Sequence, residues 1–462
     1  MKTHTKFVID RALARPLAWT TNFVTRAVAP IARRDHSMDP EGVRTIAVGK
    51  MLGMGSIIQA TPLLHDLRRT FPNAKIVFVT TRANRELIER LEVIHDAVYV
   101  DDRAPVDLAK STVVAIAELL QLEIDLYIDL EVYSAGASVL SVLSGARNRC
   151  GFYRSSARFK KGLFTHLTVF NPRVPISAIY RQLHVAVGGR KRGEPTFGPI
   201  VVRPDDKTSL AATLAKHDIE TSSRYVVVNP NASDLLLERR WPMERYVELI
   251  EELARRRTDV VLVGAPSEVE YVAGVVRALS PSARERVRDT SGKLRLGELF
   301  ALIQGAECVV TNDTGPMHFA IALDRPTVCL FGPVSPEHYG VHKNNVEMLY
   351  HAVYCSPCAH ELDEPPCAGN NVCMQLIGVG EVLAAVERQL AHQPSKQRRP
   401  ILPIVYDDAL GNGLGVIVRS SVTDKLPPRA PSDAPPSTPG DREKLPGENG
   451  DGARLERLGD DV

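Results

Sequence analysis

Several features are scarce in this sequence of 462 residues, and each scarcity narrows the class of protein. No apolar run approaches the roughly 18 residues that a membrane-spanning helix needs, which excludes an integral membrane protein. Seven cysteines are too few for a disulfide scaffold, and we expect no secretory signal. Lysine and arginine exceed aspartate and glutamate by only two (57 minus 55), so no overall charge draws the chain to nucleic acid. The sequence therefore predicts a globular cytoplasmic protein.

The two ends differ in composition from the middle. Residues 393–462 are rich in proline and glycine, which predicts a disordered tail without chemistry. Residues 1–41 form a basic extension in which aliphatic and aromatic side chains alternate with arginine and lysine. This pattern suits an amphipathic helix at the surface of an anionic membrane, broken or kinked at Pro16. The alternatives are an extra helix packed on the neighbouring domain and a frayed terminus.

The middle of the chain alternates short apolar segments with amphipathic ones. Predicted strands cover residues 44–49, 75–80, 124–130, 225–229, 259–264, 308–312 and 326–331, and predicted helices cover residues 56–70, 244–256 and 296–304. Strands separated by helices indicate parallel sheets with right-handed crossovers. The series restarts after a polar joint near residues 203–223. We therefore predict two doubly wound, Rossmann-like α/β domains facing a cleft, over residues 42–205 and 206–392.

The first candidate binding loop follows the first predicted strand. Open α/β sheets bind ligands beyond the carboxyl ends of their strands. Gly53 and Gly55 allow a substrate to approach the backbone closely, and the helix that follows favours anions at its N-terminus. A tight strand-to-helix turn without a ligand is the alternative interpretation.

Two further loops lie at strand ends in the second half. In the segment 312–318, Thr314 or Gly315 caps a helix whose free amides, with His318, form a cradle for a pyrophosphate. The alternative is a capping turn with an incidental histidine. In the segment 229–242, which opens at Asn229, Arg239 and its neighbour supply guanidinium donors for phosphate oxygens. A solvated loop with surface arginines is the alternative there.

Together these motifs resemble glycosyltransferase family 9, the heptosyltransferase-like enzymes of lipopolysaccharide core synthesis. The resemblance runs from about residue 44 to residue 390. It rests on Gly53-x-Gly-Ser-(x3)-Ala-Thr-Pro62, Asp129-Leu-Glu131, Gly145-Ala-Arg-x-Arg-x-Gly-Phe152, Arg239-Arg-Trp-Pro242, Asn312-Asp-Thr-Gly-Pro-Met-His318, Ala322-Leu-x-x-Pro326 and Leu330-Phe-Gly-Pro333. It implies a GT-B fold, a nucleotide-sugar held by the C-terminal domain, and inversion at the anomeric carbon.

The resemblance also implies roles for particular residues. The expected donor-binding residues are Asp313, Thr314, Gly315, His318, Arg239 and Asn229, with Arg239 standing where the family often has a lysine. The loop with Gly53 and Gly55 is expected to face the acceptor.

One catalytic position departs from the family pattern. Many members carry an aspartate after the glycine loop, proposed as the base that deprotonates the acceptor, whereas this chain has Ser56. The usual Asp-Leu-Gln at a strand end instead ends in Glu131. We therefore expect Glu131, or failing that Asp129, to accept the proton. The alternative is that Glu131 pairs with a nearby arginine, Arg147 or Arg149.

A cysteine cluster near the end of the second domain allows three interpretations. Its members are Cys355, Cys358, Cys367 and Cys373. Four thiolates in nineteen residues suit structural zinc, but disulfides and free surface thiols are the alternatives.

The sequence thus predicts an inverting glycosyltransferase that requires no cofactor. It would move a sugar, with heptose as one candidate, from a nucleoside-diphosphate donor to a saccharide or lipid-linked acceptor of the cell envelope. It would work in the cytoplasm, in peripheral contact with the anionic inner membrane face. The alternatives are an inactive relative that binds nucleotide or glycan, which Ser56 favours, and another GT-B enzyme such as a nucleotide-sugar epimerase.

Overall fold

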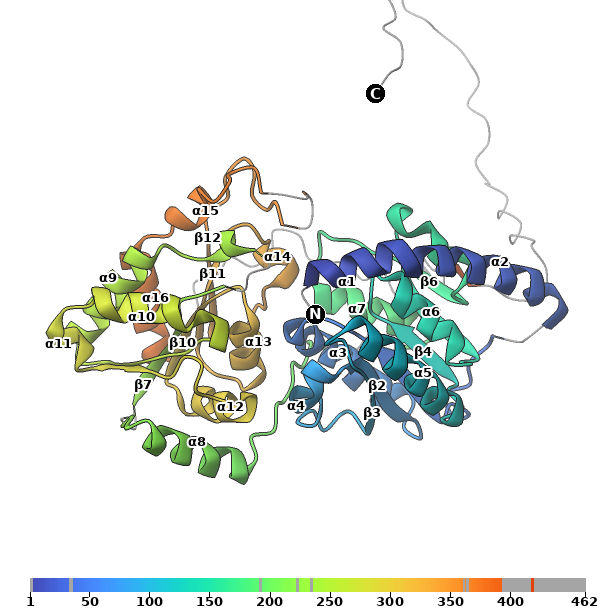
Figure 1. Cartoon of the computed structure of the whole chain (residues 1–462), viewed down its shortest axis with the longest axis horizontal. Coiled ribbons are helices and arrows are strands. Elements are labelled where there is room, and N and C mark those ends of the chain that lie inside the picture. Colours follow the sequence, from blue (N-terminus) through green and yellow to red (C-terminus); the bar gives the residue numbers. More distant parts are fainter. Residues whose placement is uncertain are drawn as a thin grey trace, which may run out of the picture. The chain divides into compact units, whose positions relative to one another are not determined.

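Two parallel sheets organise the chain, as seen in the computed structural model (Figure 1). The structure describes residues 3–32, 36–190, 193–221, 224–232, 236–359, 362, 365–392 and 417–418. The predicted α/β class with two doubly wound domains is confirmed. Most of the predicted tail lies outside the described residues.

The first lobe is built on a sheet with the strand order β6-β5-β4-β1-β2-β3. Its elements are β1 (Thr45–Gly49), α3 (Met54–Thr70), β2 (Lys75–Thr81), the 3-10 helix η2 (Arg82–Asn84), α4 (Arg85–Ile88), β3 (Asp96–Val100), α5 (Pro105–Gln121), β4 (Leu126–Asp129), α6 (Ala135–Leu143), β5 (Asn148–Tyr153), the 3-10 helix η3 (Ser155–Gly162), β6 (His166–Val169) and α7 (Ile176–Ala186). All neighbouring pairs among these strands are parallel. The short strand β13 (Ile417–Val418) adds to the β6 edge in antiparallel orientation.

The second lobe repeats this topology with the order β12-β11-β10-β7-β8-β9. Its elements are α8 (Pro204–Lys216), β7 (Tyr225–Asn229), the 3-10 helix η4 (Leu237–Arg239), α9 (Met243–Arg255), β8 (Asp259–Leu262), the 3-10 helix η5 (Pro266–Glu268), α10 (Val269–Ala278), α11 (Pro281–Arg284), β9 (Val287–Asp289), α12 (Leu296–Gly305), β10 (Cys308–Asn312), α13 (Gly315–Ala322), β11 (Thr327–Phe331), α14 (Pro336–Tyr339), β12 (Val346–Tyr350), α15 (Val372–Gln375) and α16 (Val379–Leu390). Strands β7 and β10 have the predicted bounds.

Each sheet reverses its strand order at one position. In the first lobe β1 lies between β2 and β4, and in the second β7 lies between β8 and β10. Ligands of doubly wound sheets bind at this switch point, beyond the carboxyl ends of the two strands. Gly49 pairs with Asp129 across β1 and β4, and Thr311 pairs with Asn229 across β10 and β7. The predicted acceptor loop, with Gly53 and Gly55, therefore follows β1, and the predicted donor loop, residues 312–318, follows β10. Both strands border the switch point of their sheet.

The N-terminal extension is a helical arm that packs on the first lobe. It consists of α1 (Thr3–Ile9), a π-helical turn η1 (Asp10–Ala14) and α2 (Arg15–Ala32). Asp10 accepts bonds from the N–H groups of Ala135 (3.0 Å) and Gly136 (2.9 Å) at the start of α6. Ala18 is fully buried. The extension therefore packs on the neighbouring domain through its inner face, as one of the alternative interpretations proposed.

Pro16 does not break this arm, so that part of the prediction of a break or kink is wrong. A proline in a helix removes one amide donor and its ring crowds the carbonyl of the preceding turn. Here the helix takes the wider π-helical geometry just before Pro16, where the N–H of Arg15 donates to the carbonyl of Asp10. Helical structure therefore continues on both sides of the proline. Within the part of the chain that the structure describes, no helix combines the length and apolarity needed to span a bilayer.

Candidate active site

Glu131 lies just beyond the end of β4 and holds the loop that follows β1. Its Oε1 accepts from the Lys50 ammonium at 2.8 Å and from the N–H groups of Met51 (2.8 Å) and Leu52 (3.3 Å). Burial alone would raise the pKa of Glu131, but Lys50 and the two amides outweigh it and place the pKa below its usual value. Glu131 is therefore ionised at neutral pH, with all three bonds ending on one carboxylate oxygen. Its partner is Lys50, so the pairing with Arg147 or Arg149 is wrong.

Asp129 sits deeper in the first lobe and is fully buried. Its Oδ2 pairs with the buried Lys160 ammonium at 3.0 Å and accepts from the Ser138 hydroxyl at 3.1 Å. Lys160 also donates to the carbonyl of Glu131. Burial raises the pKa of Asp129, and Lys160 opposes this shift without reversing it. Asp129 and Lys160 thus form an internal brace behind Glu131.

Ser56 and Glu131 line one cavity of about 650 Å³. Tyr180 on α7 also lines this cavity and is hydrogen-bonded to Ser56. The opposite walls come from the N-terminal arm and from the second lobe, the latter through residues that include Ser335 and His338. The cavity is large enough for a sugar and part of a second group. It brings together Ser56 and Glu131, two of the three candidate catalytic residues, while Asp129 does not line it.

Gly53 and Gly55 have different structural reasons to be glycine. Gly53, at the start of α3, has φ +87°, a backbone conformation that side chains other than glycine rarely adopt. Gly55 lies in the first turn of α3 against the second lobe. A Cβ atom there would overlap the ring of His318, reaching 2.8 Å from Nε2 and closer still to Cδ2. The glycine loop and the donor loop therefore meet at Gly55 and His318.

The donor loop after β10 is held from behind by polar bonds. Asn229 Nδ2 donates to the Thr314 hydroxyl at 3.0 Å and to the Thr311 hydroxyl at 3.3 Å. Thr314 is the N-cap residue of α13, yet its side chain makes no capping bond to that helix. Thr314 therefore takes none of the N–H groups in the first turn of α13, where Gly315 and Met317 carry one each and Pro316 has none. Such N–H groups are what an anion site uses. Asn229 is buried and positions Thr314 from behind the loop.

Arg239 and Asp313 place opposite charges beside this helix end. Arg239 Nη1 donates to the carbonyl of Asp313 at 3.0 Å and lies 3.7 Å from its Oδ2. Arg239 Nε is buried without a hydrogen-bond partner among the described residues. Burial raises the pKa of Asp313, and Arg239 opposes that shift. A guanidinium with an unused buried donor is suited to phosphate oxygens.

His318 is held in its neutral form. Burial and the nearby Arg239 lower the pKa of His318 to about 4. The Gln59 amide Nε2 lies 3.4 Å from Nδ1 and also donates to the carbonyl of Tyr339 at 3.0 Å. With Gln59 as the donor, Nδ1 accepts and the proton resides on Nε2, which we assign from this geometry. His318 then presents an N–H group on the side of the ring that faces Gly55.

Sequence reasoning missed three residues of this site. Lys50 is the partner of Glu131, Tyr180 shares the cavity with Ser56, and Gln59 orients His318. The position of Lys50 could have been recognised from the sequence, since it directly follows a predicted strand and precedes the loop with Gly53 and Gly55. The other two lie inside helices, where only the packing between elements reveals their neighbours.

The cysteine cluster gathers its four thiols around the end of the second lobe. All seven cysteines of the chain are free thiols in this structure. Burial, with a smaller contribution from Cys358, Cys355 and Cys367, raises the pKa of Cys373 to about 11. No group of three or more histidine, cysteine or acidic side chains arranged to hold a metal ion occurs in the described residues. Structural zinc stays a prediction, which metal analysis of the purified protein would test.

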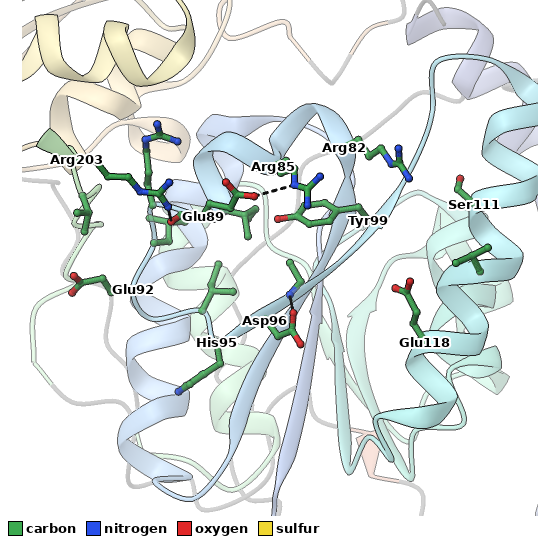
Figure 2. Close-up of a pocket in the computed structure, with 17 residues that line it drawn as sticks. Arg82, Arg85, Glu89, Glu92, His95, Asp96, Tyr99, Ser111, Glu118 and Arg203 are labelled. Carbon is green, nitrogen blue, oxygen red and sulfur yellow. Dashed lines mark hydrogen bonds and ion pairs between the residues drawn. The ribbon is translucent and has the colours of Figure 1, made fainter. Parts of the chain in front are cut away.

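A second hollow in the first lobe, of about 830 Å³, contains none of the predicted site residues. Figure 2 shows its charged lining, with Arg85 bonded to Glu89. The Arg85 guanidinium also lies over the Tyr99 ring, 5.1 Å from its centre. None of the predicted donor or acceptor residues therefore lines this hollow.

The fold and the position of these loops define the class of protein first. Two Rossmann-like lobes with the same strand order, each with its binding loops at the switch point, form the GT-B architecture. The family model described as "Glycosyltransferase family 9 (heptosyltransferase)" matches residues 115–368, more than half of the chain. The chain belongs to this family, as its motifs predicted.

Individual relatives agree with this assignment. Lipopolysaccharide heptosyltransferase 2 of Salmonella typhimurium is 38% identical over 99 residues, which cover 21% of this chain and only 28% of that relative. Lipopolysaccharide heptosyltransferase 3 of Escherichia coli is 25% identical over 356 residues, covering 74% of this chain and 98% of that one. A family 9 glycosyl transferase from Veillonella parvula has a TM-score of 0.66 and 22% identity, covering 78% of this chain and 100% of the other.

Proposed function

We propose that this chain is an inverting glycosyltransferase of cell-envelope glycan synthesis. It transfers a sugar from a nucleoside-diphosphate donor to a saccharide or lipid-linked acceptor at the cytoplasmic face of the membrane. Relatives that are named lipopolysaccharide heptosyltransferases support heptose as the sugar. A structural neighbour entitled ADP-heptose lps heptosyltransferase II supports adenine as the donor base.

The donor diphosphate binds at the N-terminus of α13. The uncapped amides of the first turn, the partial positive charge of the helix end and the Arg239 guanidinium are complementary to a diphosphate. The neutral His318 adds one N–H donor without adding charge. These groups also stabilise the charge that develops on the diphosphate as it leaves.

Glu131 removes the proton of the acceptor hydroxyl as its oxygen attacks the anomeric carbon. The new carbon–oxygen bond forms on the face opposite the diphosphate, whose bond to the same carbon breaks, and the configuration inverts. The proton passes to Glu131, and the bonding electrons leave with the diphosphate. Ser56 is neutral and positions the acceptor through its bond to Tyr180.

One observation carries this assignment more than any other. Glu131 is ionised and lines the same cavity as Ser56, at the switch point of the first lobe. Asp129, by contrast, is fully buried and paired with Lys160. The ionised carboxylate beside the glycine loop is therefore our choice for the base.

The variant Glu131→Gln tests this role. Glutamine keeps an oxygen that accepts from Met51 and Leu52, so the loop stays in place while the base is lost. We expect turnover to fall by about 10²–10⁴-fold with donor affinity preserved. Ser56→Ala is expected to cost little, and Glu285→Gln, at an exposed position on the second lobe, serves as the matched control. Release of nucleoside diphosphate and calorimetric binding of ADP measure the two quantities.

Near-normal turnover in Glu131→Gln would leave Glu131 as a clamp of the glycine loop. Donor binding without turnover in the unaltered protein would instead identify an inactive relative. Nucleotide release that needs no acceptor would favour an epimerase, since transfer requires one.

A further inference from the structure

The outer face of the N-terminal arm is apolar, and the inner face carries its polar contacts. Asn22 donates to the carbonyl of Phe159, and the Thr25 hydroxyl donates to the carbonyl of Gly162 at 2.8 Å. Both bonds fasten α2 to η3 of the first lobe. A helix that uses its polar side chains against its own protein leaves its apolar ones to face outward.

Exposed apolar side chains occur along the arm, and we call those within residues 13–28 the arm face. They are strongly exposed, from about half of the side chain to 69% for Leu13 and 74% for Phe23. The members of the arm face are Leu13, Leu17, Trp19, Phe23, Val24 and Val28. Single exposed apolar residues are ordinary, but six within residues 13–28 mark an interaction surface.

The charge around the arm face has one sign. Arg15 and Arg26 are exposed on α2, and residues 11–34 contain no aspartate or glutamate. The 3-10 helix η3, which packs against α2, continues this pattern, since it contains Arg158, Lys160 and Lys161 and no acidic residue, with Lys160 buried in its pair with Asp129. Arg158 and Lys161 of η3 are exposed beside the arm. An apolar strip bordered by cations is complementary to an anionic lipid surface.

We propose that the arm face inserts into the interfacial region of an anionic lipid bilayer and holds the first lobe against it. Figure 1 shows α2 lying along the first lobe near α6. The beginning of the same arm lines the 650 Å³ cavity through Ile9, Ala14 and Arg15, opposite Ser56 and Glu131. Membrane binding therefore places the cavity wall at the lipid surface. Resting on the proposed function, this gives a lipid-anchored acceptor direct access to the cavity.

Trp19 is a natural probe of this insertion. The chain has two tryptophans, and the other, Trp241, is fully buried in the second lobe. With the full-length protein and vesicles of equal parts phosphatidylcholine and phosphatidylglycerol, we expect Trp19 emission to shift to shorter wavelength and to be quenched by brominated lipid. We expect weaker binding to vesicles of phosphatidylcholine alone and a decline with added salt, because salt screens exposed charges.

Three double variants separate the apolar and the electrostatic contributions to vesicle binding. Leu17→Glu with Phe23→Glu should lower vesicle partition by about tenfold or more, since both side chains would carry charge into lipid. Val113→Glu with Val114→Glu, at comparably exposed positions on α5, should leave partition unchanged and controls for added charge. Arg158→Gln with Lys161→Gln should weaken binding to anionic vesicles alone, by about fivefold for each cation. Thermal unfolding of each variant checks that it folds.

Equal vesicle binding by the arm-face variant and the α5 variant would overturn the proposal. The proposal would also be overturned if the protein did not bind vesicles but formed a dimer, and if the variant with Leu17→Glu and Phe23→Glu (the arm-face variant) dissociated that dimer. In that case a second copy of the chain, and not lipid, would cover the arm face. If transfer occurs, the arm-face variant should raise KM for a vesicle-embedded acceptor and leave kcat and the KM for a detergent-free saccharide acceptor unchanged. Absence of transfer with either acceptor would contradict the proposed function without touching the vesicle result.

Discussion

Gly55→Ala tests the contact between the glycine loop and the donor loop. Gly55 lies in the first turn of α3 and its φ is negative, so alanine suits its backbone. The three atoms nearest to the added Cβ all belong to the His318 ring, with Nε2 at 2.8 Å and Cδ2 closer. His318 is itself buried, so the ring has little room to yield. Overpacking of this kind typically costs about 1–3 kcal/mol.

The source of this cost is identified by a double-mutant cycle. In the His318→Ala background the obstacle is gone, and Gly55→Ala should then be nearly neutral, giving a coupling of about 1–3 kcal/mol. Gly380→Ala on α16 is the matched control, because a Cβ there meets nothing within 4 Å. That control is expected to stabilise by about 0.4–1 kcal/mol through the unfolded chain. The assays are thermal unfolding and ADP affinity for the four proteins of the cycle and for the control.

The reasoning would be refuted if Gly55→Ala cost the same with and without the His318 ring. It would also fail if Gly55→Ala behaved like Gly380→Ala in both assays.

Three further predictions follow from the described contacts. His318→Ala should weaken ADP binding by about 1–3 kcal/mol, the cost of losing a hydrogen bond to a charged group; unchanged affinity in calorimetry would contradict the donor site. Asp10→Ala should lower the unfolding free energy by about 0.5–2 kcal/mol, as for other lost helix caps, and unchanged thermal unfolding would show that the arm does not support α6. Burial lowers the pKa of His166, His184 and His318 to about 4, so the folded protein binds fewer protons than the unfolded chain between pH 6.5 and 4. The unfolding free energy should therefore fall as the pH falls from about 6.5 to about 4, by ~1–3 kcal/mol per histidine, and a flat profile in urea titrations would contradict the buried neutral state.

Local patterns in the sequence determined the fold class and the position of the binding loops. Buried strands of parallel sheets are continuous apolar runs, so β7 and β10 were predicted with their observed bounds. A loop at the carboxyl end of such a strand faces the ligand side whatever the order of the strands. The motifs at Gly53 and Thr314 therefore predicted loops at the carboxyl edge of each sheet before any packing was known.

Tertiary structure alone decided which side chains meet. Lys50 and Glu131 are 81 positions apart, and their ion pair exists because β1 and β4 are neighbours at the switch point. Gly55 and His318 come from different lobes, so no local pattern reveals that a methyl group at position 55 would strike the ring. The two carboxylates of Asp129-Leu-Glu131 look alike in sequence, yet one is braced by buried Lys160 and the other lines the cavity.

In the N-terminal arm, too, the sequence determined one property and the tertiary structure another. Its alternation of apolar and basic residues predicted an amphipathic helix, since side-chain periodicity is a local property. Which face turns inward depends on what the first lobe offers as partners. The Asn22 side chain donates a hydrogen bond to the carbonyl of Phe159, and the Thr25 hydroxyl donates one to the carbonyl of Gly162. The apolar side chains of the arm therefore face outward. The amphipathic character thus lay in the sequence, while its orientation was decided by hydrogen-bond partners more than a hundred residues away.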